Sequence, residues 1–209
     1  MSISTNLKLI KQRLVKAARK SGRNPADIQL LVAGKYADAG QLLQLIKVGQ
    51  TLVGENRAQD LKTKYAIIGD QAEWHFIGHL QRNKVKLVVP LISMIHSLDS
   101  LRLADELDKE LTKLNKILPV LIEVNLAAEV TKSGVSLKDL DQLVKHCLSL
   151  PHLKLVGLMT MSQPSYFKIL RQLAQKYHLP ELSMGTSQDF EAAIEAGATI
   201  IRVGRLVFS

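Results

Sequence analysis

Eight short apolar segments, each joined to the next by a helical pattern, constrain the fold of this chain most strongly. They lie at residues 28–34, 51–54, 74–78, 92–97, 119–125, 153–159, 182–185 and 199–204. Strands that alternate with helices predict βαβ units and a parallel sheet, and eight such units can close into a barrel. With no Gly/Ser-rich linker in the sequence, we predict one α/β domain over residues 1–209, a (β/α)8 TIM-type barrel.

An open, doubly wound sheet is the alternative architecture. That fold usually carries a G-x-G-x-x-G segment after its first strand, whereas Lys35-Tyr36-Ala37-Asp38 follows the first apolar run here. A helical period over residues 5–20 precedes that run, and only five residues follow Gly204, so no helix is expected after the last strand. We expect the extra N-terminal helix to fill the resulting gap in the outer ring, beside strands one and eight.

Composition indicates a globular protein without a membrane span. Hydrophobic residues make up 46% of the chain, but no apolar run approaches the ~18 residues that a transmembrane helix needs. The first twenty residues lack the apolar core of a signal peptide, so we expect a cytoplasmic protein. Cys147 is the only cysteine, which excludes an internal disulfide, and its helical spacing with Leu143 and Val144 predicts a core position.

The N-terminal segment is strongly basic. Seven Lys and Arg residues precede the first acid, Asp27, and the whole chain carries a formal charge of +9. Such a helix can attract nucleic acid or anionic lipid. Aromatic residues are only 4% of the chain and no nucleic-acid-binding motif is present, so we interpret it as a solvated helix face and expect neither nucleic acid nor membrane as partner.

Lys35 is the candidate reactive group, because it ends the first apolar run. A lysine at a strand end often simply reaches water. In a (β/α)8 barrel, however, the functional face is at the C-terminal ends of the strands, and phosphate usually binds at the loops after strands seven and eight. Those loops, residues 183–189 and 202–205, offer small hydroxyl side chains, backbone N–H groups, glycine and two arginines. Alone, the first loop also fits an ordinary N-cap turn.

An amine and a phosphate site on one rim suit a phosphorylated aldehyde held as a Schiff base. Pyridoxal 5'-phosphate (PLP) fits this description, with Lys35 forming the Schiff base and Arg202 meeting the pyridine nitrogen. Arginine is a poor partner for a protonated ring nitrogen. The ring should therefore stay neutral and act as a weak electron sink, which disfavours demanding carbanion chemistry.

Residues 73–84, EWHFIGHLQRNK, form the most specific motif, since no generic barrel requires them. The other specific positions are Lys35, Gly54-Glu55-Asn56, His96-Ser97-Leu98-Asp99, Lys132-Ser133-Gly134, Gly157-Leu158-Met159, Leu182-Ser183-Met184-Gly185 and Arg202-Val203-Gly204. From about residue 30 to 208 the chain resembles the pyridoxal-phosphate homeostasis proteins, the YggS/PROSC family. These are single-domain, fold-type III PLP-binding barrels related to the N-terminal domain of alanine racemase.

The resemblance implies specific contacts with PLP. Lys35 would carry the cofactor and Arg202 would lie near the pyridine nitrogen. Ser187 and the backbone at Gly204 and Arg205 would contact the phosphate. Asn56 and Ser183 would line the pocket, and Gly185 belongs to the same phosphate loop.

The resemblance also implies a function. The family is regarded as a carrier or reservoir in vitamin B6 homeostasis, so we expect no catalytic residues and no enzyme activity. The racemase's second domain, which supplies a catalytic tyrosine, has no counterpart in these 209 residues. PLP-dependent apo-enzymes are possible recipients of the cofactor, and we expect a monomer. The alternative is a PLP-dependent amino-acid racemase or lyase.

The chain departs from the family pattern at several positions. Tyr36-Ala37-Asp38 stands where the family usually has Thr-Lys-Pro, and Thr186 stands where it usually has Met. Arg205 replaces a Thr or Ser whose hydroxyl meets the phosphate. The arginine can replace that bond with a charge-assisted one or point outward.

Other polar residues admit alternative interpretations. His75 and His79 are four apart but lie on a strand and its loop, so we expect no metal site. His75 is expected near the cofactor or in a core hydrogen bond. Asp99 and Glu123 sit at predicted strand ends and could act as acid or base; we prefer a helix cap for Asp99 and a barrel-layer contact for Glu123.

Overall fold

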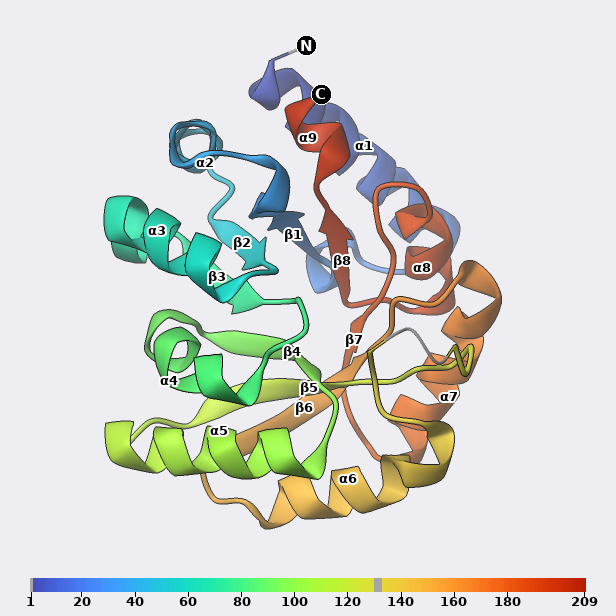
Figure 1. The fold of residues 1–209 in the computed structure, drawn as a ribbon. Helices are drawn as coiled ribbons and strands as arrows, with labels where there is room; N and C mark the ends of the chain where they lie inside the picture. The colour runs from blue at the N-terminus through green and yellow to red at the C-terminus, as the bar shows by residue number, and fades with distance from the viewer. Residues whose placement is uncertain (1, 130–132) are drawn as a thin grey trace.

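The computed structural model describes residues 2–129 and 133–209 and shows a closed parallel barrel (Figure 1). Its strands follow one another around the ring in chain order, and β8 pairs with β1. The predicted (β/α)8 barrel is therefore confirmed. The strands are β1 Gln29–Ala33, β2 Leu52–Glu55, β3 Glu73–Phe76, β4 Met94–Leu98, β5 Leu118–Glu123, β6 Leu153–Met159, β7 Glu181–Ser183 and β8 Ile200–Val203.

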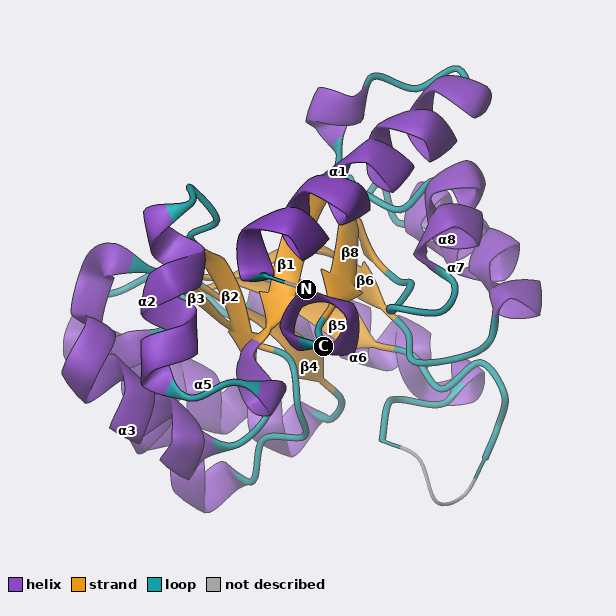
Figure 2. Ribbon diagram, turned by 90° about the horizontal axis from the view of Figure 1, so that it is seen from above, coloured by secondary structure: helices purple, strands orange, loops and turns teal. Residues whose placement is uncertain are grey.

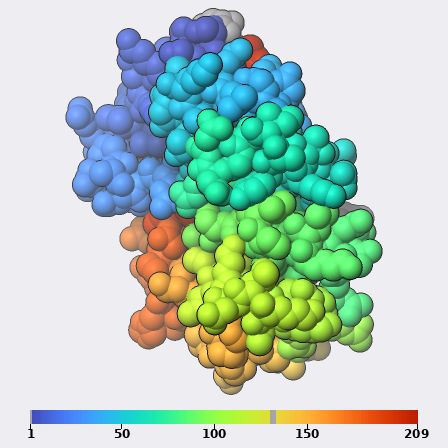
Figure 3. Space-filling view, turned by 90° about the vertical axis from the view of Figure 1, so that its left-hand side faces the viewer, coloured from blue at the N-terminus to red at the C-terminus, as the bar shows by residue number. Residues whose placement is uncertain are grey.

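Helices form the outer layer and enclose the strands, as Figure 2 shows from above. They are α1 Ile3–Lys20, α2 Ala39–Lys47, α3 Ala58–Ile68, α4 Val85–Val88, α5 Leu101–Leu114, α6 Leu137–Ser149, α7 Phe167–Lys176, α8 Phe190–Ala196 and α9 Arg205–Phe208. On the side seen in Figure 3, the surface changes from blue to yellow-green from top to bottom, so these segments stack in chain order. None of the helices in the described ranges has the length and apolar character needed to cross a bilayer.

Local sequence explains where the helices begin and end. Asp38 accepts a hydrogen bond from the backbone N–H of Gln41, and the Gln41 side chain accepts one from the Asp38 N–H. This reciprocal capping box fixes the start of α2. Gly49, with φ of +82°, follows the helix in the left-handed conformation that glycine adopts without strain.

Helix α1 packs where the N-terminal helix was expected. Its buried residues Leu7, Ile10 and Leu14 face the body of the protein, and the helix contacts α8, α9 and α2. In Figure 1 it runs beside α9 and α8, next to β8. The guanidinium of Arg23, just beyond α1, donates to the carbonyls of Ile194 and Ala198 at 2.9 and 2.8 Å. These bonds tie the segment to the C-terminal end of α8.

The expectation that no helix follows the last strand is wrong. Residues 205–208 form the single turn α9. Asn6 of α1 donates from Nδ2 to the carbonyls of Val207 and Ser209, at 3.2 and 2.7 Å. A donor from the first helix thus satisfies carbonyls that the end of a helix leaves unpaired.

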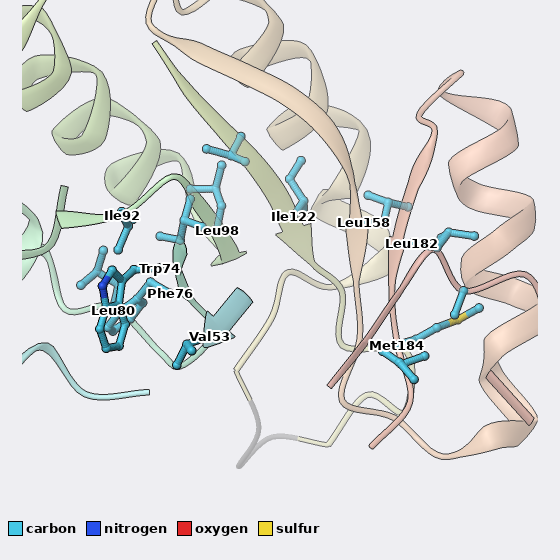
Figure 4. Packing of buried hydrophobic residues seen from close by; sticks show 14 of the residues in the cluster. Val53, Trp74, Phe76, Leu80, Ile92, Leu98, Ile122, Leu158, Leu182 and Met184 are labelled. Atoms are coloured by element: carbon cyan, nitrogen blue, oxygen red, sulfur yellow. The ribbon is translucent and has the colours of Figure 1, made fainter. Parts of the chain in front are cut away.

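Two apolar layers hold the fold together. The larger fills the space between strands and helices, and Figure 4 shows members of it, including Trp74 and Phe76. Cys147 is fully buried in this layer, as predicted. A smaller cluster lies inside the barrel and includes Leu31, Leu121 and Ile200. The last residues of β2, β5 and β7 are polar instead: Glu55, Glu123 and Ser183.

Candidate functional site

A cavity of about 450 Å³ opens at the C-terminal ends of β1, β2 and β8. Most of the predicted site residues line it: Lys35, Asn56, Ser187, Arg202, Gly204 and Arg205. The remaining lining residues are Ala33, Tyr36, Ile77, Met161, Thr186, Gln188, Leu206 and Ser209. The strand-one amine and the loops after β7 and β8 therefore open into the same space.

Lys35 lies in a single 3-10 turn, Gly34–Tyr36, that directly follows β1. Its side chain is exposed, and its Nζ lies 5.0 Å from the centroid of the Tyr36 ring. Among the described residues, no carboxylate pairs with this amine, which interacts with the Tyr36 side chain and helps to lower the pKa of its hydroxyl. The amine is therefore available to a ligand.

The turn that carries Lys35 is held by a buried ion pair. Lys64 of α3 donates to the Gly34 carbonyl at 2.8 Å and lies 2.6 Å from Glu55 Oε1. Glu55 is fully buried, and its Oε2 accepts from the backbone N–H of Asn56 at 3.2 Å. Burial raises the pKa of Glu55, and the contact with Lys64 opposes that rise. One pair thus fixes the backbone beside Lys35 and beside Asn56.

Asn56 lines the cavity and has an unpaired side-chain acceptor. Its Oδ1 is buried and finds no hydrogen-bond partner within residues 2–129 and 133–209. An unpaired buried polar atom is costly, and such atoms in folded proteins often mark functional sites. A ligand donor that reaches Asn56 would remove that cost.

The loops after β7 and β8 bring hydrogen-bonding groups and a guanidinium to the same cavity. The Gly204 N–H donates to Ser187 Oγ at 3.3 Å, which joins the two loops. Asp189 Oδ1 accepts from the backbone N–H and the hydroxyl of Thr186, at 2.6 and 2.9 Å, and so fixes the first loop. Ser187, Gly204 and Arg205 then face the cavity together.

Arg205, which replaces a hydroxyl residue of the family pattern, lines the cavity. Its guanidinium carbon lies 5.6 Å from the centroid of the Tyr36 ring. Arg205, and after it Lys35, lowers the pKa of the Tyr36 hydroxyl. Tyr36 and Arg205, two of the departures from the family pattern, are therefore spatial neighbours, and the Tyr36 ring lies near the cationic groups of both Lys35 and Arg205.

Arg202 is almost fully buried and reaches the cavity from β8. Its Nη1 donates to Ser183 Oγ at 2.5 Å, and its Nη2 donates to the Thr160 carbonyl at 2.9 Å and contacts Met161 Sδ at 3.1 Å. Burial lowers the pKa of Arg202 to about 10, while Glu123 and Asp189 oppose that shift. The guanidinium therefore stays charged at neutral pH.

Ser183 and Gly185 take other positions than the predicted pocket contacts. Ser183 is fully buried, accepts a hydrogen bond from Arg202 and is not among the residues that line the cavity. Gly185 lines a neighbouring cavity of about 430 Å³, which shares Arg202 with the first. Its φ is +88°, and a Cβ there would lie 2.5 Å from Ala193 Cβ. Gly185 thus shapes the loop against α8.

The acidic and histidine residues of the rim lie beside the site. His79 Nδ1 is 3.1 Å from an oxygen of Asp99, whereas Ser100 is the residue that precedes α5. The expected helix cap by Asp99 is therefore wrong, because its carboxylate pairs with His79 instead. Burial and Asp99 raise the pKa of Glu123 to about 7, against the opposing effect of Arg202 and His79.

Histidine, cysteine and acidic side chains in the described part of the chain form no group of three that could hold a metal ion. His75 lies in a buried hydrogen bond with His96, which matches the second of the two interpretations of this residue. The motif at residues 132–134 is only partly visible, since Lys132 lies outside the described residues.

Sequence comparisons identify the family. The alanine racemase N-terminal domain family matches residues 5–209. A pyridoxal phosphate homeostasis protein of Aquifex aeolicus is 41% identical, over 100% of this chain and 98% of its own length. That of Escherichia coli strain K12 is 36% identical, over 99% and 95%. The chain belongs to the pyridoxal phosphate homeostasis protein family. The resemblance noted in the sequence is thereby confirmed.

Solved structures of similar proteins agree with this family. PipY of Synechococcus elongatus, solved with PLP bound, has a TM-score of 0.84 and 28% identity, and the match covers 100% of both chains. A protein of unknown function from Bifidobacterium adolescentis has a TM-score of 0.93 and 28% identity, covering 99% of this chain and 94% of that one. Alanine racemase from Corynebacterium glutamicum, at 15% identity and a TM-score of 0.67, shares the barrel fold.

Proposed function

We propose that this protein binds PLP in the cavity at the C-terminal ends of β1, β2 and β8, held as a Schiff base on Lys35. It would act in PLP homeostasis as a carrier or reservoir of the cofactor. The observation that carries the proposal is that the Lys35 amine and the anion-binding loops line one cavity. Its volume of about 450 Å³ lies in the range of small-ligand sites.

The donor set fits the chemistry of PLP. When bound, PLP supplies an aldehyde that condenses reversibly with a primary amine. Arg205, Ser187 and the Gly204 backbone would hold its phosphate, because they combine a positive charge with hydrogen-bond donors. The unpaired Asn56 Oδ1 is an acceptor that a ligand hydroxyl can satisfy.

Arg202 would face the ring nitrogen and determines what the site can do. A guanidinium only donates hydrogen bonds, and with a pKa of about 10 it keeps its proton at neutral pH. The ring nitrogen opposite it would therefore stay unprotonated. This weakens the ring as an electron sink and supports storage of the cofactor over turnover.

A racemase or lyase is the second candidate function, and Glu123 is the observation that favours it. Glu123 ends β5, and a pKa of about 7 suits proton transfer near neutral pH. The residues that line the Lys35 cavity come from other strands and loops, however. We therefore favour the carrier. We further propose that the protein is a cytoplasmic monomer that passes PLP to apo-enzymes.

The test is spectroscopic. Protein mixed with PLP should gain a visible absorbance band that borohydride bleaches, and the reduced adduct should map to Lys35. Lys35→Ala should abolish the band, whereas Lys47→Ala, which removes an exposed lysine of α2, should leave it. An adduct on another lysine, or no band, would refute the proposal. If the protein turned over amino acids much faster than free PLP does, and Glu123→Gln lost this activity, the racemase or lyase function would be supported instead.

A further inference from the structure

The barrel interior holds a continuous series of hydrogen bonds that begins at Arg202. Its guanidinium contacts Ser183 Oγ at 2.5 Å, and the same oxygen lies 2.9 Å from His96 Nδ1. His96 Nε2 lies 3.0 Å from His75 Nδ1. His75 Nε2 lies 3.2 Å from Glu73 Oε1. Each of the two histidines thus uses both of its ring nitrogens.

This series crosses the barrel from one end to the other. Ser183 and His96 belong to β7 and β4, which β5 and β6 separate in the strand order, so their contact passes through the interior. Glu73 is the first residue of β3 and lies at the opposite end of the barrel from the cavity, with 56% of its side chain exposed. The members between Glu73 and Arg202 are buried.

Chemistry fixes the direction of every hydrogen bond. Arg202 can only donate, so Ser183 Oγ accepts from it. The single hydroxyl proton of Ser183 must then go to His96 Nδ1. Since that nitrogen accepts, a neutral His96 carries its proton on Nε2 and donates it to His75 Nδ1. His75 in turn carries its proton on Nε2 and donates it to the carboxylate of Glu73.

The opposite direction is unfavourable. If His96 donated from Nδ1, the Ser183 hydroxyl proton would be buried with no acceptor among the residues that the structure describes. His75 would then either turn a lone pair toward the Glu73 carboxylate or carry a positive charge inside the barrel. Burial also holds the pKa of His96 well below its ordinary value, which keeps that ring neutral.

We propose that Glu73, His75, His96 and Ser183 are positioning residues that hold Arg202 through a one-way hydrogen-bond chain. Ser183 and the Thr160 carbonyl engage the two terminal nitrogens of the guanidinium, and this fixes the plane in which its remaining N–H groups can face the cavity. The identification of the ligand as PLP rests on the proposed function. The existence of the hydrogen-bond chain does not depend on it.

The first experiment needs no ligand. Nitrogen-15 NMR of the histidines in the protein without added PLP should show His75 and His96 neutral, each with its proton on Nε2. The variants His75→Gln and His96→Gln assign the signals. A proton on Nδ1 of either ring, or a charged ring at neutral pH, would refute the proposed one-way hydrogen-bond chain.

The second experiment tests the positioning role. Ser183→Ala removes the acceptor for Arg202 and should weaken PLP binding about tenfold, the value of one charge-assisted hydrogen bond, and shift the absorbance of bound PLP. Ser93→Ala is the matched control, because Ser93 also bonds Glu73 Oε1 but is not a member of the one-way hydrogen-bond chain. Glu73→Gln keeps an acceptor oxygen for His75 Nε2, so both histidines should keep their proton on Nε2 in this variant.

The outcomes separate the two proposals. A folded Ser183→Ala protein with unchanged PLP affinity and spectrum would refute the positioning role. If the unmodified protein takes up no PLP, the proposed function fails, and the histidine tautomers still decide whether the one-way chain exists.

Discussion

Lys64 Nζ lies 2.6 Å from Glu55 Oε1, and the same amine donates to the carbonyl of Gly34, the residue before Lys35. A Cβ on Gly34 would lie 2.7 Å from that carboxylate oxygen, so the glycine lets the buried pair form directly under the turn. The cavity therefore depends on an ion pair that lies behind its wall.

Lys64→Met should destabilise the protein strongly, because it leaves the carboxylate of Glu55 buried without its cation. Loss of one partner of a buried pair costs about 3–5 kcal/mol. Urea unfolding followed by the fluorescence of Trp74, the only tryptophan, measures this. Lys62→Met, an exposed change in the same helix, should have little effect. If both variants unfold alike, the ion pair does not stabilise the turn.

Glu123→Gln should change how stability depends on pH. The folded-state pKa of about 7 lies above the ordinary 4.5, so between these values the folded protein binds more protons than the unfolded chain. Stability of the natural protein should therefore fall as pH rises through this window, by about 3 kcal/mol in total. The variant should lack that slope and be the more stable protein at pH 8. If the stabilities of the natural protein and of Glu123→Gln changed in parallel from pH 4 to pH 8, the prediction would be contradicted.

Arg205→Ser should raise the pKa of the Tyr36 hydroxyl toward its ordinary value, because Arg205 is the main cause of its depression. Ultraviolet titration of each protein, with Tyr36→Phe subtracted, isolates this group. The same variant should bind inorganic phosphate several-fold more weakly, about the effect of losing one charge-assisted hydrogen bond. Arg205→Lys keeps the positive charge, so its affinity for phosphate should lie between that of the natural protein and that of Arg205→Ser. An unchanged Tyr36 titration would show that Arg205 points away.

Ile10→Ala should cost about 2–5 kcal/mol of stability, since Ile10 is 2% exposed in the contact between α1 and the barrel. Leu9→Ala, at the neighbouring position, removes the same number of carbon atoms from a residue that is 45% exposed. Its cost should stay near 0.5 kcal/mol, typical of surface positions. Denaturation midpoints of the two variants give the comparison, and equal losses would mean that α1 does not seal the outer ring.

The sequence was sufficient to predict the barrel, because each buried strand carries its own apolar run. Strand β6 matches its predicted bounds, residues 153–159. Helix α9 was missed because a single turn has no period to read. Its partner, Asn6, lies about two hundred residues away in the chain.

The site was predictable where position alone places a residue on the rim, as for Lys35, Ser187 and Arg202. It was not predictable where a rim residue bonds another side chain of the site. Ser183 was expected at the pocket, but it is fully buried and bonds Arg202 of the next strand without lining the cavity. Lys64 gave no indication of its role, since an amphipathic pattern does not show which polar residue reaches inward to a buried carboxylate.

The seam of the barrel, where β1 pairs with β8, has a consequence for the lifetime of the protein. Lys35 follows β1 and Arg205 follows β8, and these strands meet only when the ring is closed. Local opening along this seam would pull the two walls of the cavity apart, so a molecule that bridges them opposes opening in proportion to its concentration. Proteases that attack partly opened chains should then degrade ligand-free copies first, and ligand supply would adjust the abundance of the protein.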